Sequence, residues 1–143
     1  MKSLLDTCVI AELVKRRPSA RVCEWVETQP EDRLYLSVLT LGEVRKGIAR
    51  LPASRKRRRL EQWVEVDLRR TFHGRVLPVT AEIAERWGIL SAEAQSRGRP
   101  VPVIDALLAA TALVADLTLV TRNTRDVEAS GARWLNPWED AAD

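Results

Sequence analysis

Short runs of apolar residues alternate along the chain with longer segments in which apolar positions recur every three or four residues. Such runs are typical of buried strands, and the longer segments are typical of helices with one inward face. The strands are expected at residues 3–5, 34–36, 75–79, 117–120 and 133–135. Pro78 lacks a backbone N–H, so the strand at residues 75–79 should lie at an edge of the sheet or end there. Strands alternating with helices predict an α/β fold, a parallel sheet with helices packed around it.

Capping and breaking residues delimit the predicted helices. A first helix opens at Thr7 and is stopped by Pro18, while Ser19 and Ser37 can cap the next two helices. Residues 101–115 are so apolar that we expect a largely buried helix. Further helices are expected around residues 60–68 and from 80 to about 98.

Size and composition are those of one globular domain spanning residues 1–143. Hydrophobic residues make up 45% of the chain, but no apolar run reaches the roughly 20 residues that a membrane span needs. Asp6 interrupts the N-terminal apolar run, which is unlike a signal peptide. Cys8 and Cys23 fall in helical patterns without metal-ligand spacing, so we expect a reduced, cytoplasmic protein.

The positive charge is concentrated in one place. The net charge is +3, and Arg55-Lys56-Arg57-Arg58-Arg59 alone carries five positive charges, so the remainder of the chain is slightly acidic. The run can be a solvated helix face, or it can contact a phosphate backbone and make binding salt-dependent.

Four acidic residues stand in unusual local contexts: Asp6, Glu43, Asp105 and Asp126. Asp6 ends the first predicted strand, Glu43 lies in an otherwise uncharged stretch, and Asp105 is the only charge within residues 101–115. A carboxylate in apolar surroundings must be protonated, paired or metal-bound, because burying it bare costs several kcal/mol. If the four converge, hard divalent cations are their natural partners, which points to phosphate chemistry.

The predicted topology brings opposite ends of the sequence together. Ligands of parallel α/β sheets bind beyond the carboxyl ends of the strands. Asp6 lies at that end of the first strand, and Asn123 and Asp126 lie just past that end of a later one. Asn123 and Asp126 can also act as a helix N-cap and its capping-box partner, and the two roles are compatible because a helix N-terminus attracts anions.

Several other chemistries are excluded by the sequence. His73 is the single histidine and lies in a turn beside Gly74, so a histidine-rich metal site and a Ser-His-Asp triad are not supported. Neither a Walker-type nor a dinucleotide-binding glycine loop is present. Cys8 is better explained as a small buried residue than as a nucleophile.

Four segments in register resemble the PIN-domain nucleases, specifically the VapC toxins of prokaryotic toxin–antitoxin pairs. The ending Leu135-Asn136-Pro137-Trp138 is similar to the FitB-type branch of that family. The match covers essentially the whole chain. The segments are Leu5-Asp6-Thr7-Cys8-Val9-Ile10, Leu36 to Val44, Ile104 to Ala112, and Leu119-Val120-Thr121-Arg122-Asn123-Thr124-Arg125-Asp126.

The resemblance implies a three-layer α/β/α sandwich and a Mg²⁺- or Mn²⁺-dependent endoribonuclease site. Asp6, Glu43 and Asp105 match the three family acids. Asp126 matches a second acid common in this branch, whereas some relatives have Asp where this chain has Asn123. We therefore expect Asp126 as the fourth carboxylate and Asn123 as a ligand to a metal-bound water or an orienting group. The number of metals, one or two, stays open.

Within that site, Asp6 and Asp105 are expected to be direct metal ligands, with Glu43 and Asp126 holding metal-bound waters or a second ion. The supporting hydroxyls are expected from Thr7 and Thr121, which can hydrogen-bond the carboxylates or a substrate phosphate. Candidate contacts to the nucleic-acid backbone are Arg45, Lys46 and Arg122.

The resemblance also implies partners: an RNA substrate, a cognate VapB-type antitoxin whose tail occupies the active-site groove, and a second copy in a homodimer. Trp25 and Trp63 can contribute to a contact surface or to the core. Two alternatives remain: a non-catalytic or regulatory nucleic-acid-binding PIN module, and a DNA-directed or flap-type nuclease. The complete Asp6, Glu43 and Asp105 set argues against the first, and the lack of residues for a duplex-threading arch argues against the second.

Overall fold

The computed structural model describes residues 1–139 and contains a five-stranded, fully parallel sheet with the strand order β3-β2-β1-β4-β5. The predicted α/β class with a central parallel sheet is confirmed. The strands are β1 (Ser3–Leu5), β2 (Leu34–Ser37), β3 (Val76–Leu77), β4 (Thr118–Val120) and β5 (Trp134–Leu135).

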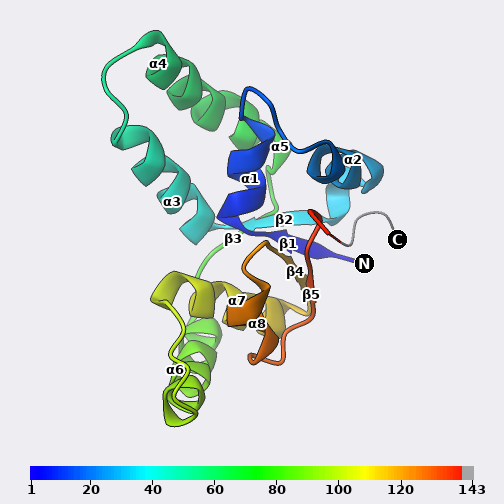
Figure 1. Ribbon diagram of the computed structural model, residues 1–143, viewed down its shortest axis with the longest axis vertical. Helices are drawn as coiled ribbons and strands as arrows, with labels where there is room; N and C mark the ends of the chain where they lie inside the picture. Colours follow the sequence, from blue (N-terminus) through cyan, green and yellow to red (C-terminus); the bar gives the residue numbers. More distant parts are fainter. Residues whose placement is uncertain (140–143) are drawn as a thin grey trace.

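Helices cover both faces of this sheet (Figure 1). On one face lie α1 (Thr7–Leu13), α2 (Ala20–Thr28), α3 (Val38–Ala49), α4 (Arg55–Gln62), the π-helical segment η2 (Trp63–Leu68) and α5 (Arg69–Thr71). On the other lie α6 (Ala81–Ser96), α7 (Val103–Ala115) and α8 (Thr124–Glu128). A single 3₁₀ turn, η1 (Glu31–Arg33), precedes β2. The sandwich therefore has three layers, as the family resemblance implied.

The topology has a switch point between β1 and β4. From β1 the chain proceeds outward through β2 to β3, and it then returns to pair β4 on the other side of β1. Leu5 pairs in register with Val120, and the amide of Asp6 donates to the Val120 carbonyl at 3.0 Å. The residues that follow these two strands lie at the carboxyl ends of the strands, which is where open parallel sheets bind ligands.

Successive side chains of each strand point to opposite faces of the sheet, so the core has two layers. Leu5 and Val120 pack in the cluster beneath α1 and α2, whereas Leu4 and Leu119 pack in the cluster beneath α7. All four residues are 0 or 1% exposed. Strands buried on both faces read as continuous apolar runs, which explains the pattern of the sequence.

Hydroxyl and carboxyl side chains begin most of the long helices. Ser19 Oγ accepts from the Val22 amide, Ser37 Oγ from the Leu39 amide, and Thr80 Oγ1 from the Ile83 amide. The caps at Ser19 and Ser37 are those that the sequence predicted, and Thr80 lies where the later helix was expected to begin. Helix α6 ends just before Gly98, whose φ of +70° suits glycine at a helix end.

Most elements lie within one or two residues of their predicted bounds, and three differ in a way that has a structural meaning. Strand β3 covers only Val76–Leu77, because Pro78 removes the donor that would extend its pairing at the sheet edge. Helix α1 ends at Leu13 instead of continuing to the basic residues before Pro18. The regular helix expected around residues 60–68 is α-helical only to Gln62 and continues as the π-helical segment η2.

Trp25 belongs to the core, where it is 6% exposed, so it does not offer the contact surface considered for it. Trp63 is half-buried and packs against the same core cluster. No helix within residues 1–139 is long and apolar enough to cross a lipid bilayer.

Candidate active site

Asp6 is the centre of the hydrogen bonds at the switch point. Its Oδ1 accepts from the Thr7 amide at 2.7 Å, which caps α1, and its Oδ2 accepts from Thr121 Oγ1 at 2.7 Å. Asp6 is only 5% exposed, and Thr121 is completely buried. Burial raises the pKa of Asp6, and the negative charge of Glu43 raises it further, while the Thr121 and Thr7 hydrogen bonds oppose that rise. These two bonds fix the carboxylate against β4.

Glu43 reaches the same site from α3. Its Oε1 accepts a hydrogen bond from Thr7 Oγ1 at 2.6 Å. Thr7 thus binds Asp6 through its backbone and Glu43 through its side chain. Glu43 is half-buried, so the expectation that it lies in the site instead of on the open surface agrees with its position.

Asp105 and Asp126 complete the group of acids. Burial raises the pKa of Asp105, and the negative charges of Asp6, Asp126 and Glu43 and a hydrogen bond to Asp126 add to that rise, which brings the pKa to about 6. Asp105 lies in the first turn of α7, and Asp126 lies in the first turn of α8. All four predicted acids therefore interact electrostatically at one edge of the sheet.

The four acids form a site with only oxygen donors, which is the chemistry that hard divalent cations prefer. No three acidic, histidine or cysteine side chains within residues 1–139 stand close enough together to chelate a metal as they are. Unneutralised carboxylates repel one another, and Mg²⁺-like ions keep several waters and need only one or two direct carboxylates. The open spacing and the raised pKa of Asp105 therefore fit a hydrated divalent cation.

The raised pKa of Asp105 predicts how the stability of the metal-free protein depends on pH. Between the unfolded pKa of 3.8 and the folded value of about 6, the folded state retains a proton that the unfolded state releases. The free energy of unfolding should thus fall as the pH rises through this window, by about 1 kcal/mol after allowing for solvent screening. Urea titrations in EDTA at pH 5 and pH 7 measure the fall, and Asp105→Asn should reduce it. A fall of equal size in that variant would contradict the prediction.

Asn123 lies at the N-cap position of α8, but its side chain makes no capping hydrogen bond. Its backbone amide donates to Thr121 Oγ1 at 3.0 Å, so Thr121 accepts from Asn123 and donates to Asp6. The capping box considered for Asn123 and Asp126 is therefore not formed through the Asn123 side chain. The exposed Asn123 side chain lies at the rim of the site, beside Thr121.

The three predicted backbone-contacting residues have different surroundings. Arg45 forms an ion pair with Glu65 at 3.1 Å on the surface, and Lys46 is exposed on the same helix. The guanidinium of Arg122 lies 4.8 Å from the centroid of the Trp138 ring, a cation–π contact that restrains it. Of the three, Arg122 alone directly follows a residue that hydrogen-bonds the Asp6 carboxylate.

Cys8 was not predicted to belong to this site. Its Sγ lies 3.8 Å from Asp6 Oδ2 and accepts from the Arg122 amide at 3.5 Å. Burial and the charge of Asp6 raise the pKa of the thiol to about 11, so it stays protonated, in agreement with the expectation that it is not a nucleophile. The sequence feature that could have indicated this position is that Cys8 lies two residues after Asp6 in the segment Leu5-Asp6-Thr7-Cys8-Val9-Ile10.

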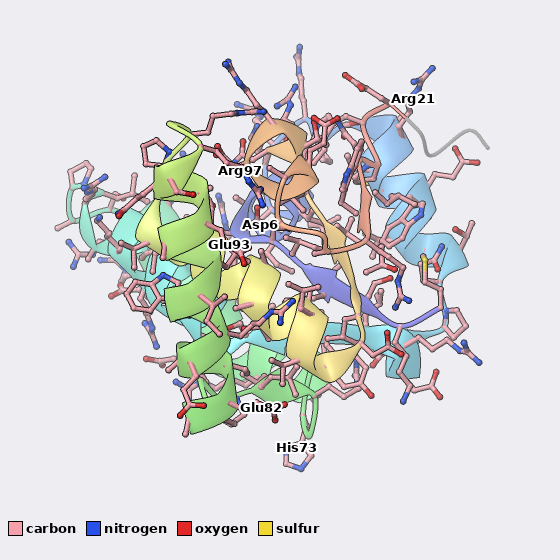
Figure 2. The ribbon with its side chains drawn as sticks, turned by 90° about the horizontal axis from the view of Figure 1, so that it is seen from below. Asp6, Arg21, His73, Glu82, Glu93 and Arg97 are labelled. Atoms are coloured by element: carbon pink, nitrogen blue, oxygen red, sulfur yellow. The ribbon has the colours of Figure 1, made fainter. Side chains whose placement is uncertain are left out.

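Glu12, a second unexpected residue, is a buried acid outside the carboxylate group. It forms an ion pair with Lys15 at 2.9 Å and accepts from the Ser19 amide at 2.8 Å, which joins α1 to α2. His73 projects at the periphery of the molecule, far from Asp6 (Figure 2). Histidine thus has no part in this site.

Comparisons with known proteins agree with this geometry. The family model described as "PIN domain" matches residues 3–130. The VapC ribonuclease Y4jK of Sinorhizobium fredii is 36% identical over 138 residues, which cover 96% of this chain and 99% of that protein. The crystal structure of FitAcB from Neisseria gonorrhoeae is similar with a TM-score of 0.92 and 33% identity, covering 96% and 99% of the two chains. A toxin–antitoxin complex from Klebsiella pneumoniae is similar with a TM-score of 0.72 and 27% identity, covering 96% and 99%.

Proposed function

This chain belongs to the PIN-domain family, and on that premise we propose that it is the toxin of a type II toxin–antitoxin system. It is an endoribonuclease that hydrolyses phosphodiester bonds in RNA with the help of a divalent cation. We propose Mg²⁺ or Mn²⁺ as that cation, because the candidate ligands are carboxylate oxygens.

One observation carries the proposal: four carboxylates, contributed by segments far apart in the sequence, interact at the switch point of the sheet. A regulatory module that only bound nucleic acid would have no use for them, because they repel a polyanion and one another. A nuclease needs them, since a bound cation both neutralises the carboxylates and attracts the phosphate. The catalytic reading is therefore favoured over the non-catalytic one.

The residues of the site would have different roles in binding the cation. Asp6 and Asp105 would bind the cation directly, and Glu43 and Asp126 would hold its waters. Thr7 and Thr121 orient two of these carboxylates through hydrogen bonds of 2.6 and 2.7 Å. When bound, the cation supplies stabilisation of the negative charge that develops on the phosphate and lowers the pKa of a coordinated water.

A restraining partner follows from the activity, because an RNA-degrading protein must be inhibited in the cell that makes it. We propose a VapB-type antitoxin as that partner. A positively charged antitoxin side chain among the carboxylates would neutralise them as a cation does, which makes inhibition and metal binding competitive. A homodimer remains part of the proposal.

The test is inducible expression of the wild type and of Asp6→Asn, followed by mapping of the RNA ends that appear. We expect growth arrest and defined new RNA ends with the wild type only. Co-expression of the cognate antitoxin should restore growth. Arrest with the same RNA ends in Asp6→Asn would contradict the assignment, as would an arrested wild-type culture in which no new ends arise.

A further inference from the structure

A groove leads away from the carboxylates between three helices. Its volume is about 1060 Å³, and it is lined by residues of α1, α3 and the α4–η2 segment. Thr7 and Glu43 line its inner end, so the groove is continuous with the candidate active site. From Glu43 to Ile48 the α3 wall extends over five residue steps, or about 7.5 Å at the rise of a helix, and Leu51 lines the groove just beyond the end of α3.

The walls of the groove combine apolar and basic side chains. The apolar lining consists of Ala11, Val14, Val44, Ile48, Leu51, Leu60 and Trp63. The charged lining away from Glu43 is entirely basic: Lys15, Arg16, Lys56 and Arg59. Lys15 is paired with Glu12, whereas Arg16, Lys56 and Arg59 have no ion pair within residues 1–139.

The five basic residues at the start of α4 have different surroundings. Arg57 is structural, because it donates to the Leu51 carbonyl at 3.0 Å and lies 3.8 Å from Glu61. Arg55 and Arg58 are exposed and lie outside the groove. Lys56 and Arg59 line the groove.

Trp63 lies on the same helix face as Lys56 and Arg59. The three residues are spaced by three and four positions, which places them along one face of the helix. Trp63 is only half-buried and lines the groove at the point where α4 passes into the π-helical segment. Local π-helical geometry is often found at functional sites.

We propose that this groove holds the single-stranded RNA next to the cleaved bond, with Lys56 and Arg59 contacting phosphates and Trp63 stacking on an unpaired base. This inference rests on the proposed ribonuclease function and adds the path of its substrate. A row of cations beside an aromatic ring is the arrangement with which proteins bind single strands. Only an unpaired base can reach an indole that lines a groove, so the protein would select unpaired RNA.

Charge complementarity favours RNA as the occupant. Within residues 1–139, Glu43 at the inner end is the only acidic side chain that lines the groove. A polyanion would thus pass from a basic region to the cation-holding carboxylates, where its phosphate reacts. The same basic residues would raise affinity at low salt and lose it as salt rises.

Binding of a fluorescein-labelled single-stranded RNA of mixed sequence, measured by anisotropy in EDTA, tests this path without interference from cleavage. Lys56→Ala/Arg59→Ala should reduce the slope of log affinity against log salt by about 1.4, the value for two phosphate contacts on a single strand. Trp63→Ala should weaken binding about tenfold, which is typical for loss of one base stack. The matched control is Arg55→Ala/Arg58→Ala, which removes the same charge from the same helix outside the groove.

A variant that leaves the core intact gives an independent test. A Cβ at Gly47, which lines the groove, would meet no atom within 4 Å, so Gly47→Glu fits the fold and adds a negative charge to the groove. We expect it to abolish RNA binding. Gly88→Glu is the matched control, because Gly88 is equally free of neighbours but lies in α6 on the opposite face of the sheet.

The outcomes separate this inference from the proposed function. Equal losses in the groove pair and the control pair would show diffuse electrostatic binding and would overturn the inference. So would groove variants that bind RNA normally and lose only an antitoxin, or a wild type that binds no single-stranded RNA. A wild type that binds RNA through the groove yet cleaves none would support the inference and contradict the ribonuclease assignment.

Discussion

Replacing Asp105 with asparagine is expected to lower RNA cleavage by more than about a hundredfold while raising the stability of the metal-free protein. The loss of activity follows because the variant removes a candidate metal ligand, and even outer-shell partners of a metal contribute up to about a hundredfold. The gain in stability follows because the pKa of Asp105 is raised by burial and by three neighbouring acids. Ionised Asp105 thus opposes folding at neutral pH.

Cleavage assays and urea titrations in EDTA at pH 7 measure the two effects. Asp32→Asn is the matched control, because it makes the same chemical change at an exposed residue of η1, outside the group of four acids. It should leave both quantities unchanged. Full activity in Asp105→Asn would refute its assignment as a ligand, and a less stable variant would refute the account of its pKa.

Removing divalent cations is the second change with a large expected effect: EDTA should abolish cleavage, and Mg²⁺ or Mn²⁺ should restore it. The same cations should stabilise the folded protein, since they bind carboxylates that are assembled only in the folded state. At a concentration about 100-fold above the dissociation constant, the free energy of unfolding rises by about 2.7 kcal/mol.

Thermal denaturation with and without Mn²⁺ gives a measurement that does not depend on catalysis. The wild type should melt at a higher temperature with Mn²⁺, and Asp105→Asn should show a much smaller shift. Cleavage that persists in EDTA would rule out the metal-dependent mechanism. An equal shift in the two proteins would place the bound cation away from Asp105.

Hydrophobic patterning was sufficient to predict the layers of the fold, because strands buried on both faces and helices with one apolar face have different periods. The caps at Ser19 and Ser37 were predictable because a cap is a local interaction: each side chain accepts from an amide only two or three residues away. The π-helical segment was not predictable, since its residues have an ordinary helical composition and Val64 and Leu68 are buried in the core as they would be in an α-helix.

The candidate site was predictable where a charge interrupts an apolar pattern, as at Asp6 and Asp105. The topology argument alone linked Asp6 with Asp126, while the family resemblance was needed to add Glu43 and Asp105. The Thr121–Asp6 bond is one of the hydroxyl–carboxylate contacts expected from the resemblance, whereas the Arg122–Trp138 contact depends on tertiary structure and left no local signal. The groove could not be foreseen either, because three helices from different parts of the chain form it.

The hydrogen bond between Thr121 and Asp6 joins residues 115 positions apart. During synthesis, Asp6 leaves the ribosome first, but its partner on β4 and the Asp126 carboxylate emerge only after most of the chain has been translated. Until β4 pairs with β1, the carboxylates have no common edge on which to meet. A nascent chain, or one terminated before β4, therefore lacks the assembled cluster, so the ribosome that makes this protein is not exposed to an active nuclease until β4 and α8 have been made.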